Sequence, residues 1–174
     1  MGKAFYLETN LFGKLKSMKY ARLTKEQFEE LHQEFINFLA TQSITAQEWA
    51  ELKMTKPEVV EEELDIFSDL VWEGVLNKVE FLEHISPQQL MLFRISQTHL
   101  DLIAIKIENP QIDITSGYGY KWLQQNIQDD SVSLFTSTKA IKDDRNKDIF
   151  VLIQQGASIT KGQLYTYFSD LLGE

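Results

Sequence analysis

The spacing of apolar side chains predicts three helices in the first part of the chain. Between residues 25 and 40, apolar positions recur every three or four residues, as they do on one buried face of a helix. A shorter helix follows, and Pro57 ends it and opens the third, because proline suits the first turn of a helix. The third helix carries Val60, Leu64, Phe67 and Val71 on one side and a row of carboxylates on the other.

Three helix starts are marked by the same short pattern. An apolar residue precedes Thr24, Thr45 and Thr160, and a glutamine or glutamate follows each threonine three positions later. In such a capping box the threonine hydroxyl accepts a hydrogen bond from an otherwise unpaired backbone N–H of the first turn. We therefore expect a helix to begin directly after each of the three threonines.

After Gly74 the apolar period shortens towards two, which is typical of strands. The pattern predicts strands over residues 79–85, 90–95 and 100–107, with a possible fourth over residues 132–136. Short polar connections favour an antiparallel meander. Residues 79–85 also continue the helical spacing of the preceding segment, so both a strand and a helix remain open there.

The last third of the chain is expected to be mainly helical. Residues 110–120 are interpreted as a loop, followed by a short helix over about residues 121–127. A further helix carries Ile149, Leu152 and Ile153 and ends at Gly156, where glycine tolerates the left-handed conformation. With the helix expected after Thr160, it forms a C-terminal helical hairpin.

These elements define an α+β fold with N-terminal helices, a small antiparallel meander of three or four strands, and the C-terminal helical hairpin. We expect one domain over residues 18–174, because no linker or repeat divides them. Residues 1–17 show little periodicity and are interpreted as an extension that is non-native or poorly ordered. Both Met1 and Met18 remain open as the native start.

Short motifs spread along the chain resemble one family. They are the run from Met18 to Thr24, the pair Val71-Trp72, the stretch from Phe81 to Pro87, and Arg145 followed by Ile149-Phe150 and Gly156. In these motifs the chain resembles a family of short, uncharacterised bacterial proteins that is known as a domain of unknown function. The resemblance covers about residues 18–173 and implies no activity, cofactor or partner.

Composition restricts the classes of function. The chain has no cysteine, which excludes disulfides and thiolate chemistry and fits a reducing cytoplasm. Its formal net charge of −9 argues against nucleic acid as a partner, because such binding depends on cations that neutralise phosphates. No apolar stretch is long enough to cross a membrane. We therefore expect a cytoplasmic protein that binds neither nucleic acid nor membrane.

The sequence contains no motif for catalysis, metal binding or a cofactor. The three histidines lack any spacing typical of metal ligands, and the glycine-rich signatures of nucleotide sites are absent. One speculative ligand rim is the segment from Gly117 to Trp122. Its candidate ligand-binding residues are Tyr118, Tyr120, Lys121 and Trp122, with Arg145.

The remaining candidate is the acidic side of the third helix, which is either a solvated face or a docking face for a basic partner. Its carboxylates are Glu58, Glu62, Asp65, Asp69 and Glu73. The leading hypothesis is a non-catalytic, protein-binding or regulatory module; the alternative is a small-ligand-binding protein or enzyme with a dispersed site near residues 117–122. The first 22 residues contain five cations and one carboxylate, so self-association through this basic arm is also open.

Overall fold

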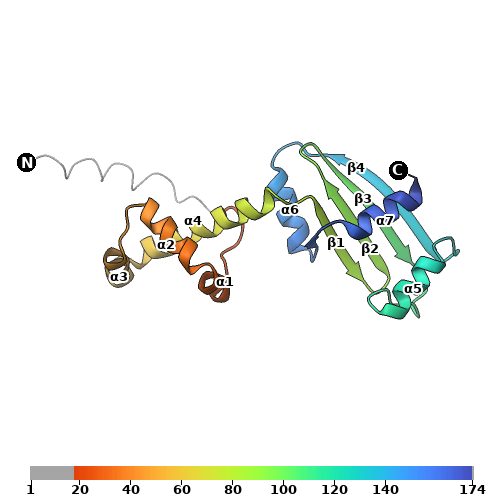
Figure 1. Cartoon of the computed structure of the whole chain (residues 1–174), viewed down its shortest axis with the longest axis horizontal. Coiled ribbons are helices and arrows are strands. Elements are labelled where there is room, and N and C mark those ends of the chain that lie inside the picture. The colour runs from red at the N-terminus through yellow and green to blue at the C-terminus, as the bar shows by residue number, and fades with distance from the viewer. Residues whose placement is uncertain (1–17, 174) are drawn as a thin grey trace, which may run out of the picture. The chain divides into compact units, whose positions relative to one another are not determined.

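The computed structural model describes residues 18–173, which divide into two compact units between Trp72 and Glu73. We call residues 18–72 the helical unit and residues 73–173 the sheet unit. The single-domain organisation stays a prediction, and the expectation for residues 1–17 lies outside the described residues. The α+β class is confirmed by seven helices and an antiparallel five-stranded sheet among these described residues (Figure 1).

The helical unit contains α1 (Lys25–Glu30), α2 (His32–Thr41), α3 (Ala46–Thr55) and most of α4 (Pro57–Leu76). Two of the predicted capping boxes are confirmed. The hydroxyl of Thr24 accepts from the N–H of Gln27 at 3.3 Å, and that of Thr45 accepts from the N–H of Glu48 at 3.2 Å. These reciprocal caps satisfy N–H groups that the first turn of each helix leaves unpaired.

The single helix predicted over residues 25–40 is interrupted. Leu31 has φ −100° and ψ 21°, so α1 ends before it and α2 begins after it. The rings of Phe28 and Phe35, one from each helix, both pack on Phe67 of α4, with centroids at 5.8 and 5.0 Å. The apolar face was predicted correctly, but the periodicity did not show the break within it.

The sheet unit is built on a four-stranded antiparallel meander that a fifth strand extends. Its strands are β1 (Phe81–Ser86), β2 (Gln89–Ile95), β3 (His99–Ile107), β4 (Val132–Ala140) and β5 (Ser158–Thr160). Their order is β4-β3-β2-β1-β5, and every neighbouring pair is antiparallel. The meander was predicted, and the alternatives for residues 79–85 are now decided: α4 ends at Leu76 and β1 begins at Phe81.

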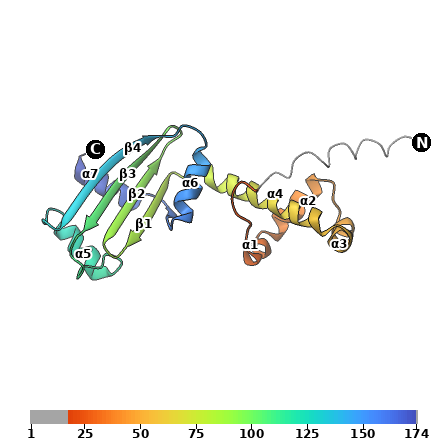
Figure 2. The same ribbon diagram turned by 180° about the vertical axis from the view of Figure 1, so that it is seen from behind.

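The sheet has two unlike faces (Figures 1 and 2). On the first face, α5 (Gly117–Gln125) and α7 (Gln163–Leu172) cover an apolar core whose sheet residues are Leu90, Leu92, Ile103, Ile105 and Ile107. On the second face, α6 (Arg145–Gln154) lies near β1 and β2, and Leu82, Phe93 and Ile95 are buried there. We call these the covered face and the open face.

The third predicted helix start is wrong. Ile159 and Thr160 belong to β5, which pairs with β1, and α7 begins only at Gln163. The Thr160 hydroxyl donates to the Glu83 carboxylate at 3.1 Å and accepts from the N–H of Gly162 at 3.2 Å. Residues 158–160 thus form backbone hydrogen bonds with the edge of β1, and their own sequence gives no sign of this pairing. The two C-terminal helices exist, but a strand separates them.

The glycine-rich segment is the first turn of α5 and does not form the loop that was predicted. Ser116 caps the helix by accepting from the N–H of Gly119 at 3.0 Å. A Cβ at Gly119 would lie 1.9 Å from the carbonyl oxygen of Asp113. Glycine is therefore required here for close packing of the helix against the preceding turn.

Candidate functional site

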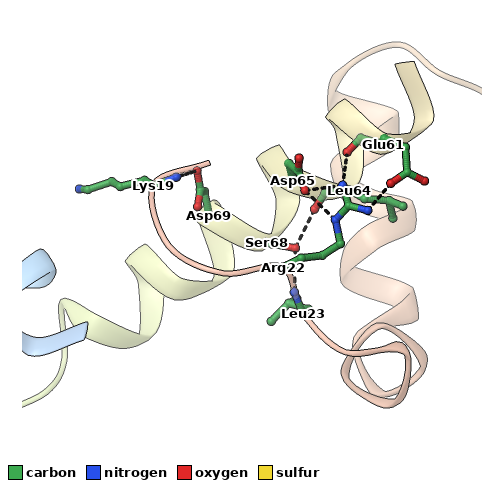
Figure 3. Close-up of polar contacts among 8 residues, drawn as sticks. All are labelled: Lys19, Arg22, Leu23, Glu61, Leu64, Asp65, Ser68 and Asp69. Carbon is green, nitrogen blue, oxygen red and sulfur yellow. Dashed lines mark hydrogen bonds and ion pairs between the residues drawn. The ribbon is translucent and has the colours of Figure 1, made fainter. Parts of the chain in front are cut away.

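The acidic side of α4 is partly occupied by the chain itself (Figure 3). The extended segment of residues 18–24 lies along the helix, and Tyr20 and Leu23 are buried. The Asp69 carboxylate accepts from the backbone N–H groups of Lys19 at 2.7 Å and Tyr20 at 2.9 Å. Asp69 therefore holds this segment in place.

Arg22 joins the same segment to two further carboxylates of α4. Its guanidinium donates to Asp65 at 2.6 Å and forms an ion pair with Glu61 (Figure 3). The hydrogen bond to Glu61 raises the pKa of Arg22, and Asp65 adds to the effect, whereas partial burial opposes it. Arg22 and its carboxylates are all partly exposed, so these pairs contribute little to stability.

The predicted acidic docking face is therefore divided. Asp65 and Asp69 accept hydrogen bonds from residues 19–22 within the helical unit. Glu73 accepts from the Asn146 amide at 2.9 Å within the sheet unit. Glu58 and Glu62 are exposed. Of the five carboxylates predicted to share one face, these two make no hydrogen bond or ion pair with another residue in the described part of the chain.

The aromatic segment does not form one rim. Tyr118 is 73% exposed, whereas Trp122 packs against the core of the covered face. Lys121 is exposed, and Tyr120 is partly buried. Helical geometry separates these side chains, because neighbours along a helix point about 100° apart.

The Tyr120 phenol has a raised pKa. Burial raises the pKa of its phenol most strongly, and the nearby Tyr167 and Glu83 raise it further, whereas a hydrogen bond with Gln124 lowers it. The group stays protonated at neutral pH and can donate or accept a hydrogen bond.

Arg145 is the first residue of α6, a helix that lies at the other end of the sheet from α5 (Figure 1). Its guanidinium donates to the carbonyls of Ser96 at 2.9 Å and Leu76 at 3.0 Å, and also to that of Val79. The structure thus joins Arg145 to the end of α4 and the β2–β3 turn. It does not bring Arg145 together with the aromatic residues of α5.

Two small hollows lie on the described surface. A hollow of about 290 Å³ lies along α3, lined among others by Ile44, Leu52 and Lys56. A second, of about 30 Å³, lies between α6 and the open face beside His84 and Met91. Within residues 18–173, no three histidine or acidic side chains gather as metal ligands do.

The long edge strand β4 is the clearest candidate for a binding site. Ile141, just after β4, donates its N–H to Thr98 at 2.8 Å, and the carbonyl of Ser131, just before β4, accepts from Glu108 at 2.7 Å. Both contacts point towards β3. Because backbone groups alternate in direction along an antiparallel strand, the odd-numbered residues of β4 face β3 and the even-numbered residues face outward.

No strand among the described residues lies beside the outward backbone groups of β4. β3 is the only strand neighbour of β4 among residues 18–173. The N–H groups concerned are those of Leu134, Thr136, Thr138 and Ala140, since Val132 already donates to Asp129. β4 has nine residues, of which one is charged and none is proline. It therefore has few of the charges and none of the prolines that usually prevent an edge strand from pairing with another chain.

Beside this edge, the open face is apolar and accessible. Phe135 is 59% exposed and shares a row across the sheet with Ala104, Met91 and His84. Leu102, in the next row, is half-buried. The edge thus provides backbone groups for pairing, and the row beside it provides apolar contact area.

Sequence reasoning missed this site. The strand was predicted only over residues 132–136, and its edge position depends on pairing between distant segments. One signal was present: the alternation of serine and threonine with Leu134 and Phe135 lacks the continuous apolar run of a central strand.

The fold is that of a small α+β protein whose sheet ends in an edge strand, β4. The chain belongs to a family of unknown function, DUF6495, whose model matches residues 18–173. No curated protein and no solved structure matches the chain. Among the described residues, no helix has both the length and the apolar character needed to span a membrane.

Proposed function

We propose that this protein is a non-catalytic protein-binding module that takes up an extended segment of a partner chain along β4. The observation that carries the proposal is the row of outward backbone groups at Leu134, Thr136 and Thr138, which have no strand beside them among residues 18–173. A partner strand supplies the missing hydrogen bonds, and side-chain contacts on the two faces give selectivity.

The chemistry of the edge describes the segment that suits it. β4 carries one charged side chain, Lys139, so main-chain pairing and apolar contacts dominate. On the open face, an apolar side chain of the partner would cover Phe135, which is 59% exposed. We expect a segment rich in β-branched and aromatic residues, because these fit a pleated, half-buried surface.

The test uses displayed random peptides about as long as β4, selected on the wild-type protein and on two variants at Thr136. Thr136→Pro removes one outward N–H without removing a hydrogen bond to β3, whereas Thr136→Val keeps the N–H. Peptides should be enriched on wild type and Thr136→Val and lost on Thr136→Pro. Absence of enrichment, or equal enrichment on all three, would overturn the proposal.

Amide exchange gives an independent readout of the same binding. A selected peptide should slow exchange at Leu134, Thr136 and Thr138, whose N–H groups face outward. Exchange at Phe135 and Ser137 should change little, since their N–H groups already face β3. Slowing at both sets alike would indicate general stabilisation instead of strand addition.

A basic partner at the acidic face of α4 is a second candidate. Residues 18–22 show how this face holds an extended segment with cations, through Arg22 and Asp69. Glu58 and Glu62 extend the same charge beyond that segment. Oligolysine should bind in low salt, and the double change Glu58→Gln with Glu62→Gln should weaken it; unchanged binding would exclude these two residues.

We further propose that the protein works in the cytoplasm. The absence of cysteine supports this, because a chain that needs no disulfide suits a reducing compartment. Fractionation of source cells with an antibody to the protein tests it, and recovery from an extracellular or membrane fraction would refute it.

A further inference from the structure

We infer that the partner that binds at the β4 edge is a second copy of this chain. The two β4 strands pair antiparallel, so that the two sheets join into one. The inference rests on the proposed function, because it names the partner at the same edge. Two identical edges related by a twofold axis satisfy each other, since every outward group of one copy meets an outward group of the other.

The charges that flank β4 favour this antiparallel pairing. Asp129 and Asp130 precede the strand, whereas Lys139 and Lys142 stand at its end, where Lys139 also lies 3.8 Å from Asp148 and Lys142 directly precedes Asp143 and Asp144. Antiparallel pairing places the two aspartates before one strand beside the two lysines at the end of the other. Parallel pairing would place like charges together, which destabilises a strand pair.

The edge is also a neutral region in an acidic chain. From Ser131 to Thr138 there is no charged residue, although the chain as a whole has a formal net charge of −9. Two copies can therefore approach along β4 without opposing carboxylates at the contact. Repulsion between their distant charges is weakened by salt.

The exposed phenylalanine selects the register. Outward residues must pair with outward residues, and the register that pairs Leu134 with Thr136 of the second copy places Phe135 opposite its own symmetry mate. That position is a non-hydrogen-bonded pair, where Cα atoms are about 4.5 Å apart and side chains are closest. The two rings would cover each other on the open face, which explains why Phe135 is 59% exposed in the single chain.

The first measurement is the mass in solution over a range of concentrations. Wild type and Thr136→Val should pass from the mass of one chain to twice that mass as concentration rises. Thr136→Pro should remain at the mass of one chain. Because proline could disturb the strand, Phe135→Lys provides a second variant: it changes an exposed side chain, places two cations on the axis, and should also abolish the dimer.

The second measurement determines the register by cross-linking. The natural chain has no cysteine, so introduced cysteines are the only thiols. Ser133 of one copy should lie opposite Ser137 of the other. After oxidation, a mixture of Ser133→Cys and Ser137→Cys chains should form a disulfide-linked dimer, whereas either variant alone should form little.

A single-chain mass at every concentration, or a dimer that persists in both Thr136→Pro and Phe135→Lys, would overturn the inference. Cross-linking of Ser133→Cys alone would overturn the register. If wild type is a single chain but displayed peptides are still selected at β4, the proposed function stands and self-pairing fails. If the dimer forms and no peptide is selected, self-pairing stands, and uptake of segments other than a second copy at β4 fails.

Discussion

Arg22 and Arg145 show how the same residue type contributes differently in two surroundings. Arg22 lies on the surface and pairs with the carboxylates of Glu61 and Asp65. Arg145 is partly buried, and its guanidinium binds the carbonyls of Leu76, Val79 and Ser96. Surface ion pairs can be replaced by water, but buried carbonyls that lose their donor cannot always be solvated.

We therefore expect Arg145→Ala to lower the free energy of unfolding by roughly 1–3 kcal/mol. Arg22→Ala, the matched control, should lower it by about 1 kcal/mol or less. Urea unfolding followed by circular dichroism measures both. Equal losses would show that water satisfies the carbonyls around Arg145.

The buried carboxyl group of Glu63 should make the stability of the fold depend on pH. Its Oε2 atom is buried and has no hydrogen-bond partner among the described residues. Burial raises the pKa of Glu63, and the charge of Glu62 raises it further. The folded protein therefore binds this proton more readily than the unfolded chain, and stability falls as pH rises through the raised pKa.

Glu63→Gln should thus be more stable than wild type at neutral pH. The difference should shrink as pH falls through the raised pKa and disappear below about 4.3, where the unfolded carboxyl is also protonated. Thermal unfolding at several pH values measures it. Glu58→Gln, on the exposed side of the same helix, is the control and should change stability little.

At the scale of elements, the two glycines in the first turn of α5 differ in the space available for a side chain. Gly119 lies against the backbone of Asp113, where a Cβ would come within 1.9 Å, whereas a Cβ at Gly117 meets nothing within 4 Å. Both residues belong to the first turn of the same helix. The two positions therefore differ in the room for a side chain, whereas the helix propensity of glycine is the same at both.

Gly119→Ala should lower the free energy of unfolding by roughly 1–3 kcal/mol, because the helix must move away from the preceding turn. Gly117→Ala should be neutral or stabilising by up to about 1 kcal/mol, since alanine favours a helix more than glycine does. Denaturant unfolding of the two variants tests this. A loss at Gly117 as large as that at Gly119 would contradict the packing described here.

For the whole molecule, charge decides which polymers can bind. A formal net charge of −9 repels polyanions, and binding to nucleic acid needs cations that displace counterions from phosphates. We expect no binding of duplex or single-stranded oligonucleotides in fluorescence anisotropy, even in low salt, where such attraction is strongest. Tight, salt-sensitive binding would reveal a basic surface that the net charge conceals.

Much of the fold follows from local sequence. Thr24 and Thr45 begin helices because their hydroxyls cap N–H groups only three residues away. The meander is predictable because alternating side chains and short connections leave few arrangements. The class of the fold and the family were therefore accessible without coordinates.

The same local pattern failed at Thr160, where the structure places an edge strand. A capping box shows that a helix can start, but it cannot show that β1, distant in sequence, offers hydrogen bonds to the same segment. Arg145 was likewise predicted as a ligand residue, and its carbonyl partners lie about 50 to 70 residues away in the chain. Such choices depend on long-range contacts that periodicity does not contain.

The sequence by itself determined the helix starts after Thr24 and Thr45, the strand pattern of the meander, the acidic charge and the lack of thiols, because each depends on nearby residues or on composition. Only the tertiary structure decided that residues 18–24 cover part of the acidic face and that β4 forms the edge of the sheet. Both depend on which distant segments pair, and pairing also sets which backbone groups of β4 point outward. The candidate binding site consists of those groups, so it exists only in the folded chain.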